Sequence, residues 1–316
     1  GIRFAYSNVS GWNFAGQNLT DAHFYAAILT GADFSHANLA GANFEAAILT
    51  DVDFTGADVR GASFGKTYHG GTNYAGTGIT PAQLYSTASY EAHDLSGINL
   101  NSNNLSGTNF VGQNLSNAVF GNGIVGYTPP NGATLTSADF SEANLANATF
   151  GSSNLSGANF RHANLANTNF SYIAGETCTA DFPTSSCSPD FAGPTLTDAD
   201  FTGAEIRGAS FYRGYDYNAS MYVGGITLAQ LYSTASYQSH DLSGIGLGGS
   251  DFAGGNFASQ NLTNANFGNA ALTGADFTAA DARGAYLYPT ADAISTNFIW
   301  RDGHIHGLDL SGSGLR

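Results

Sequence analysis

The feature that most constrains this chain is a large apolar residue at every fifth position. An α-helix repeats about every 3.6 residues and a β-strand about every two, so neither keeps a period of five on one side. A constant five-residue period indicates a solenoid, in which one short unit is stacked many times and each unit contacts only its neighbours. In the first part of the chain the pattern occupies Phe4, Val9, Phe14, Leu19, Phe24, Leu29, Phe34, Leu39, Phe44, Leu49, Phe54, Val59 and Phe64.

The five-residue unit reads as Ala, Asp or Asn, Phe or Leu, Ser or Thr, and Gly. It appears in Ala32-Asp33-Phe34-Ser35 and in Ala158-Asn159-Phe160, which is followed by Ala163-Asn164-Leu165. This unit resembles the repeat of the pentapeptide-repeat family, and its register persists through most of the chain. The resemblance implies an all-β fold: a right-handed, four-sided parallel β-helix in which four units make one coil.

Four sides also follow from the sequence itself. The segment Tyr25–Thr30 recurs as Glu45–Thr50, a displacement of twenty residues or one coil. Phe and Leu alternate along the repeat, so opposite sides of a coil carry like residues and the core volume stays constant. The residue two before each core residue must be small, and it is commonly Ala. Larger residues occupy this position at several places, and we expect a widened corner, with the glutamine amides bonded to carbonyls, at Trp12, Gln17, Gln113 and Gln260.

We interpret residues 1–316 as a single solenoid with five insertions. Two of these insertions are copies of each other, because Ile79–Leu100 matches Ile226–Leu247 at 18 of 22 positions. A segment of solenoid has therefore been duplicated together with its interruption. The insertions span approximately 65–94, 121–134, 171–195, 212–241 and 288–304.

Each duplicated insertion contains a predicted short helix. Thr80-Pro81-Ala82-Gln83 and Thr227-Leu228-Ala229-Gln230 both fit a capping box, and Pro81 occupies the first helical position. We expect these helices to lie against the side of the rod. The tyrosines near them either pack on the rod or contact a partner, and the lateral contact candidates are Tyr85, Tyr90, Tyr232 and Tyr237.

The sequence offers no recognisable catalytic motif. It contains no phosphate-binding glycine loop with its lysine, no nucleophile elbow and no cluster of cysteines. Carboxylate pairs such as Asp51 with Asp53, or Asp139 with Glu142, are expected on an exposed wall rather than in a cleft, where nothing separates their pKa values. We therefore predict that the protein is not an enzyme and binds no cofactor.

Two histidines near the end of the chain are candidate metal ligands. His304 and His306 flank Ile305, which is in phase with Leu310. If Ile305 points inward, both imidazoles face outward, where they either share a metal ion with Asp302 or form an exposed surface pair. The surface pair is the favoured interpretation, so no metal site is predicted.

The net charge of −15 arises mostly from aspartates beside the core residues, and these should line the outside of the stack. Such a surface repels nucleic acid and attracts a basic partner. No apolar stretch approaches the roughly 20 residues of a membrane span.

The only two cysteines, Cys178 and Cys187, lie close together in an insertion rich in Ser, Thr and Pro. We expect them to form a disulfide that closes a small surface loop, and the alternative is two free thiols. A disulfide of this kind favours an oxidising compartment, outside the cell or at its surface.

Both ends of the sequence lie inside the repeat pattern. We expect the last coil of one copy to stack on the first coil of the next, an interface that does not close and therefore builds fibres. The alternative is that the ends are boundaries within a longer solenoid. The residues predicted at the end-to-end interface are Gly1, Ile2, Arg3 and Phe4 on one side, and Leu310, Leu315 and Arg316 on the other.

These features favour a secreted structural protein that stacks head to tail into an extracellular filament or surface layer. Its main partner would be itself, with other cell-surface components as further partners. The family resemblance supplies an alternative, since some members are acidic rods that imitate duplex DNA and bind DNA gyrase. A surface adhesin that uses the tyrosine-rich insertions is a third hypothesis.

Overall fold

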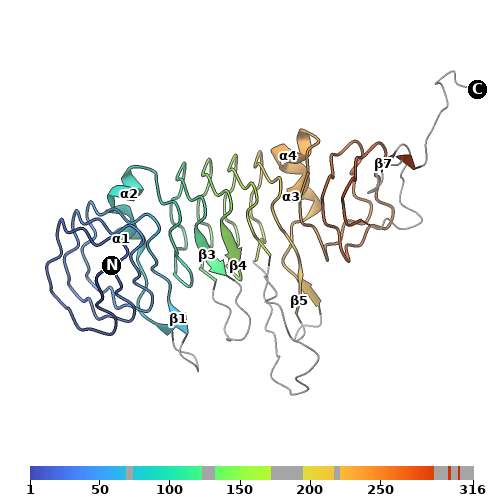
Figure 1. The fold of residues 1–316 in the computed structure, drawn as a ribbon. Coiled ribbons are helices and arrows are strands. Elements are labelled where there is room, and N and C mark those ends of the chain that lie inside the picture. The colour runs from blue at the N-terminus through green and yellow to red at the C-terminus, as the bar shows by residue number, and fades with distance from the viewer. Residues whose placement is uncertain are drawn as a thin grey trace, which may run out of the picture.

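The backbone forms a parallel ladder with a step of twenty residues. The computed structural model describes residues 1–68, 74–122, 132–171, 195–216, 221–287, 298–299 and 305–306. Arg3 pairs in parallel with His23, and His23 pairs with Asn43. Each coil lies directly on the one before it, and the stack is a right-handed four-sided β-helix, as predicted (Figure 1).

Every uninterrupted coil contributes one bridged residue to each of four columns that run along the rod. The five-residue unit supplies one side, so four units return the chain to its starting column. Column 1 begins with Arg3, His23 and Asn43; column 2 with Asn8, Ile28 and Ile48; column 3 with Asn13, Asp33 and Asp53; and column 4 with Asn18, Asn38 and Asp58.

The chain turns a corner after each side, and the unit around Phe34 shows how. The Ala37 amide donates to the Phe34 carbonyl at 3.0 Å, and His36 has φ +56°, the sign that a type II turn requires at its third residue. The Asp33 Oδ1 accepts from the Ser35 amide at 2.9 Å. This contact is an Asx turn, and Asp33 is half-buried. The Asp or Asn before each core residue therefore shapes the corner as well as the surface.

The residues at intervals of five point inward. Phe34 and Leu39 have 0% exposure, and Ala32 at the small position has 1%. Phe24 stacks on Phe44 in column 1 at 4.9 Å between ring centroids, and Phe34 meets Phe44 edge to face at 5.5 Å. Opposite sides therefore do carry like residues, and the phenylalanines of columns 1 and 3 interlock along the axis.

Among the described residues, the named helices and strands lie in or beside the interruptions. The helices are α1 (Pro81–Tyr85), α2 (Ala88–Glu91), α3 (Leu228–Ser233) and α4 (Ala235–Gln238). The antiparallel pairs are β1 (Thr67–Tyr68) with β2 (Tyr74–Ala75), β5 (Gly214–Asp216) with β6 (Met221–Val223), and β7 (Phe298–Ile299) with β8 (Ile305–His306). β3 (Val119–Asn122) pairs in parallel with β4 (Thr149–Gly151). Both predicted capping boxes are present, at Thr80 with Gln83 and at Thr227 with Gln230.

All five interruptions leave the rod at one corner. Each follows a core residue of column 1, whose bridged members include Ser63, Val119, Asn169, Ser210 and Tyr286. β1, β3 and β5 accordingly lie along one edge of the rod in Figure 1, and the helices lie on the other side. The second and third interruptions return at column 2, through Thr134 and Thr195, so they affect that corner alone.

The first and fourth interruptions differ from the prediction in one respect. We expected helices against the side of the rod, but α1–α2 and α3–α4 lie within the stack. Leu84 and Leu231 are fully buried in the core, and the chain rejoins the ladder only in column 4, at Asp94 and Asp241. Each helix pair therefore replaces the sides of one coil that columns 2 and 3 would otherwise occupy.

The last interruption also differs from its expected bounds. Ile299 already pairs with Asp281, which places it on the ladder in column 4. Ile305 pairs antiparallel with Ile299. Leu310 lies outside the described residues.

Replacing Phe34 by Ala should lower the free energy of unfolding by about 3–5 kcal/mol, because a fully buried ring is lost between two stacked neighbours. The Phe34 ring lies 4.8 Å from that of Phe14 and 5.7 Å from that of Phe54. Urea denaturation followed by circular dichroism measures the change. Thr55→Ala on the exposed wall is the matched control and should stay within about 0.5 kcal/mol of the parent chain; an equally small effect of Phe34→Ala would contradict the core assignment.

Candidate functional site

The helix pair α1–α2 satisfies the backbone of the coil beneath it. We number coils along the chain, so that coil 3 is residues 41–60, coil 4 is 61–96 and coil 5 is 97–116. The Gln83 side-chain amide donates to the carbonyls of Leu49 at 2.9 Å and Val52 at 3.1 Å. The Gly56 amide donates to the Ser86 carbonyl at 2.8 Å. Groups that a regular coil would pair are therefore paired by the helices.

Two tyrosines of the helix pair bond to the backbone of coil 5, which lies above them. The Tyr85 hydroxyl accepts from the Asn109 amide at 2.8 Å, and the Tyr90 hydroxyl donates to the Asn109 carbonyl at 2.8 Å. The two rings lie 4.7 Å apart. The Gln113 side-chain amide donates to the Tyr90 carbonyl at 3.0 Å, which is the amide-to-carbonyl bond predicted for that position.

The second copy reproduces this arrangement. The Tyr232 hydroxyl accepts from the Asn256 amide at 2.7 Å, and the Tyr237 hydroxyl donates to the Asn256 carbonyl at 2.8 Å. The Gln260 side-chain amide reaches the Tyr237 carbonyl at 3.0 Å. Coil 9 (residues 208–243) therefore carries α3–α4 as coil 4 carries α1–α2, and coil 10 (residues 244–263) rests on it.

The four tyrosines predicted as lateral contacts thus have internal roles for their hydroxyls. All four side chains are half-buried. Burial, with a smaller contribution from the neighbouring tyrosine, raises the pKa of Tyr90 and of Tyr237 above the ordinary tyrosine value. The backbone partners of these tyrosines are Asn109 and Asn256, which the sequence analysis does not predict. Their equivalent positions after the two duplicated insertions are the sequence signal that could have identified them.

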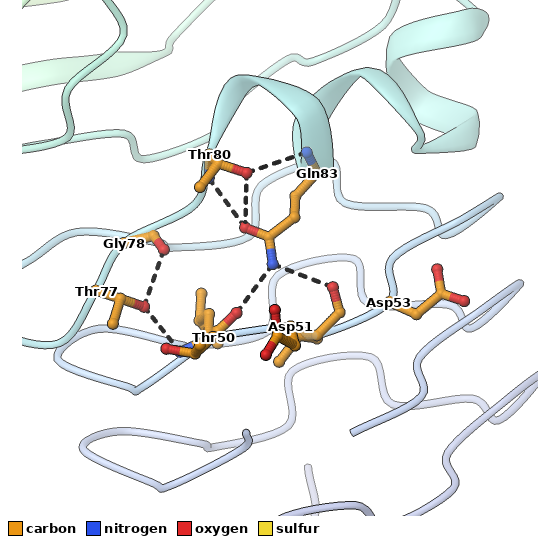
Figure 2. A pocket seen from close by; sticks show the side chains of 9 residues that line it. Thr50, Asp51, Asp53, Thr77, Gly78, Thr80 and Gln83 are labelled. Atoms are coloured by element: carbon orange, nitrogen blue, oxygen red, sulfur yellow. Dashed lines mark hydrogen bonds between the residues drawn. The ribbon is translucent and has the colours of Figure 1, made fainter. Parts of the chain in front are cut away.

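An open groove lies where α1 meets coil 3, with a volume of about 610 Å³. Figure 2 shows its polar floor: the Gln83 amide holds the carbonyls below, and the Thr77 hydroxyl donates to the Gly78 carbonyl. The same hydroxyl accepts from the Leu49 amide at 2.8 Å. The groove is lined by Leu49, Thr50, Asp51, Val52, Asp53, Thr77, Gly78, Thr80 and Gln83.

Asp51 and Asp53 are exposed, as expected, and they also border this open groove, which was not expected. Asp200 is the counterpart of Asp53 in the second copy, and it forms an ion pair with Arg161 at 3.3 Å. Asp53 has no such ion pair among the described residues. The polar groups of the floor hold the stack together, and no nucleophile is set beside a base.

An arginine marks the junction of each helix-bearing coil with the coil below. Arg60 contacts Asp58 at 2.6 Å and Asp94 at 3.7 Å. The hydrogen bond from Arg60 lowers the pKa of Asp58, against the effect of burial. Arg207 bridges Glu205 and Asp241 in the same way. These half-exposed pairs contribute about 0–1 kcal/mol each, so they favour the register of column 4 more than they stabilise the fold.

The remaining predicted site residues are only partly placed. Gly1, Ile2, Arg3 and Phe4 form the first side of coil 1 (residues 1–20), where Phe4 is half-buried and Ile2 is 52% exposed. Cys178, Cys187, Asp302, His304, Leu310, Leu315 and Arg316 lie outside the described residues.

Within the described ranges, no group of three His, Cys, Asp or Glu side chains is arranged to hold a metal ion. The same part of the chain contains no helix with the length and apolar character needed to cross a membrane.

A family model described as pentapeptide repeats matches the chain in eight copies, over residues 27–65, 94–123, 133–171, 241–278 and 250–287. The matched stretches consist mostly of regular coils, and they omit coil 1, the helix pairs and most of the interruptions. No curated protein matches the chain at a significant level.

Several solved structures resemble the chain. HetL from the cyanobacterium Nostoc, a pentapeptide repeat protein involved in regulating heterocyst differentiation, is 22% identical, with 96% of this chain and 83% of HetL covered and a TM-score of 0.20. A pentapeptide repeat protein of the Arabidopsis thaliana thylakoid lumen is 28% identical over 43% of this chain and 66% of its own, with a TM-score of 0.20. QnrB1, a plasmid-mediated fluoroquinolone resistance protein, is 15% identical over 91% of this chain and 92% of its own, with a TM-score of 0.24. Similarity of this degree transfers no function.

Replacing Tyr90 by Phe should lower the free energy of unfolding by about 1 kcal/mol, because the Asn109 carbonyl loses its partner while the packing of the ring is kept. Tyr237→Phe should have the same effect through Asn256. Urea denaturation of each variant measures the loss. Tyr25→Phe, which changes a tyrosine in a regular coil, is the control. If all three variants lose the same free energy of unfolding, the tyrosine hydroxyls do not replace hydrogen bonds of the ladder.

Proposed function

We propose, from the premise that this chain belongs to the pentapeptide-repeat family, that it is a non-enzymatic structural protein whose rods associate end to end outside the cell or at its surface. The observation that supports this proposal is the parallel ladder, in which each regular coil pairs its backbone with the next coil and can pair with a further coil in the same way. A secreted filament or surface layer is the assembly that such an association builds.

The underside of coil 1, the face that points away from coil 2, carries backbone groups of the kind that are paired between successive regular coils. In coil 2 the amides of Ile28, Asp33 and Asn38 donate to carbonyls of coil 1. The equivalent amides in coil 1, those of Asn8 and Asn13 among them, have no hydrogen-bond partner within the described residues. A row of unpaired ladder groups is a template for another coil.

Apolar side chains accompany those groups. Ile2 is 52% exposed and Trp12 is 51% exposed, whereas Ala22 and Ala32, which hold the same places in coil 2, are buried. The Trp12 ring lies 5.9 Å from the rings of Phe4 and of Phe14. Covering this surface with a coil would remove apolar area from water and pair the backbone at the same time.

The walls of the rod suit lateral contacts at one place. The common corner from which all five interruptions leave gives each rod one distinctive edge, and insertions on one side of a solenoid are often its binding face. This edge favours a surface adhesin as the second candidate function. An adhesin would keep its attachment to a surface when end-to-end association is lost. The gyrase-binding alternative stays an untested prediction.

The extracellular location rests on the cysteine pair. A Cys178–Cys187 disulfide would close a ten-residue loop from the distinctive edge and would persist only in an oxidising compartment. Intact mass spectrometry after alkylation without reductant should show no modified thiol, whereas two alkylated cysteines in protein purified from its native compartment would contradict both the disulfide and the location.

The end-to-end association predicts a specific effect of Ile2→Glu. The new carboxylate would be desolvated between coils, so the association constant should fall by about 100-fold or more. Sedimentation velocity over a range of concentrations, with negative-stain microscopy of the same samples, measures assembly. Val111→Glu on the side wall is the control, because Val111 is also an exposed apolar residue and should assemble like the parent. A parent chain that remains monomeric at high concentration, or an Ile2→Glu chain that assembles normally, would rule out this interface.

A further inference from the structure

The groove beside α1 presents two carboxylates that the chain does not neutralise. Asp51 and Asp53 are both exposed, and the Asp51 carboxylate has no hydrogen bond or ion pair within the described residues. The Asp53 Oδ1 accepts from the Thr55 amide at 2.8 Å, the Asx turn of its corner, and its Oδ2 has no partner in the same part of the chain. The arginine of coil 3, Arg60, contacts Asp58 in column 4 instead.

The second copy shows what such a carboxylate binds. The Asp200 Oδ1 accepts from the Thr202 amide at 2.8 Å, in the same turn as in the first copy. The Asp200 Oδ2 accepts from the Arg161 guanidinium at 3.3 Å. Burial raises the pKa of Asp200, but the hydrogen bonds from Thr202 and Arg161 outweigh burial and lower this pKa below the ordinary aspartate value. A guanidinium is therefore a ligand that this carboxylate position accepts.

One difference between the copies accounts for the ion pair that the first copy lacks. Arg161 lies in the coil below Asp200, directly after the core phenylalanine of that side. The same place in the coil below Asp53 is held by Ser35. Serine carries no charge, so the chain supplies a guanidinium to the second copy and none to the first.

A backbone donor faces the groove as well. In coil 2 the Gly31 amide donates to the Thr50 carbonyl at 2.9 Å, and the equivalent amide in coil 3 is that of Asp51. The Asp51 amide has no acceptor within the described residues, because the helix pair takes the place of the next rung. The groove volume of about 610 Å³ lies within the range of pockets that hold a small ligand, roughly 300–1,000 Å³. An arginine side chain with a short stretch of its backbone therefore fits.

We propose that the groove beside α1 binds an arginine side chain presented by a partner protein. The guanidinium lies on the Asp53 Oδ2 with the Asp51 carboxylate beside it, and a peptide carbonyl of the partner accepts from the Asp51 amide. The second copy is closed to this partner, because Arg161 already occupies the equivalent oxygen of Asp200. Each chain thus carries one such site on its side, and the site does not depend on association of rods at their ends.

An NMR titration of the full ¹⁵N-labelled chain with a capped Gly-Arg-Gly tripeptide tests the site. The backbone amide signals of Asp51 and Asp53 should shift and saturate as the peptide is added, while those of Asp198 and Asp200 stay in place. A peptide with citrulline in place of arginine keeps the shape and loses the charge, so it should bind about fivefold more weakly or less well still. Equal shifts in both copies, or equal binding of the citrulline peptide, would overturn the proposal.

Two exchanges between the copies make the test specific. Ser35→Arg gives the first copy a guanidinium of its own and should weaken peptide binding by about fivefold. Arg161→Ser removes the guanidinium from the second copy and should make the Asp200 amide respond to the peptide. Each variant installs the residue that the other copy already carries at that corner, so both should keep the circular dichroism spectrum of the parent. Unchanged binding by the Ser35→Arg chain, or no response at Asp200 in the Arg161→Ser chain, contradicts the assignment.

Asp53→Asn separates the groove from the overall charge of the protein. Asparagine keeps the Asx turn and loses the charge, so the peptide should bind about fivefold more weakly. Asp251→Asn is the matched control, because Asp251 is an exposed aspartate of a regular coil whose Oδ1 likewise accepts from a corner amide, that of Ala253 at 3.1 Å. If both variants lose the same affinity, the peptide responds only to the net charge of −15 and the groove is not its site.

Discussion

The rest of this structure depends on the backbone hydrogen bonds between successive coils. Between regular coils a core residue donates its amide to the coil above, as Phe34 does to the Asp53 carbonyl at 2.8 Å. A buried backbone group without a partner costs about 1–3 kcal/mol, and the ladder repeats on four sides, so no coil can change shape without leaving groups unpaired in both neighbours. An interruption must therefore either leave between ladder positions or supply substitutes for the bonds it removes.

Both solutions occur in this chain. The interruptions at 121–134 and 171–195 leave and return at the corner between columns 1 and 2, where the ladder is not broken. The helix pairs supply substitutes instead: Gln83 and Ser86 for the coil below, and two tyrosine hydroxyls for the coil above. The precision of this replacement, repeated in α3–α4, explains why the tyrosines and glutamines are the same in both copies.

The same constraint accounts for the absence of an evident catalytic centre among the described residues. The Gln83, Tyr85, Ser89 and Tyr90 side chains of the helix pair bond to a neighbouring coil, and Gln83 forms part of the groove beside α1 (Figure 2). What remains available for function among the described residues is the edge that carries the interruptions and the backbone ladder itself. A structural role uses these surfaces directly, which is why the proposed function concerns them.

The sequence predicts the core and the corners almost completely, because period, side-chain size and turn chemistry are local properties of the five-residue unit. It also predicts the capping boxes at Thr80 and Thr227 and the carbonyl contacts of Gln113 and Gln260. It did not predict that α1–α2 lies inside the stack, since the contact of Gln83 with Leu49 joins residues far apart in the chain and no periodic signal marks it. The groove around Asp51 was missed for the same reason: a cleft created by a substituted coil has no sequence motif of its own.

Hydrogen exchange of three amides in coil 3 tests most directly whether a helix pair replaces two sides of a coil. Leu49, Gly56 and Val59 donate to Thr77 Oγ1, the Ser86 carbonyl and Ser89 Oγ, all from residues of the first interruption. Our account predicts that these amides are protected as strongly as Leu29, His36 and Leu39, which occupy the same places in coil 2. Exchange at nearly the solvent rate, with coil 2 still protected, would show that the helices are a side excursion and would contradict the account.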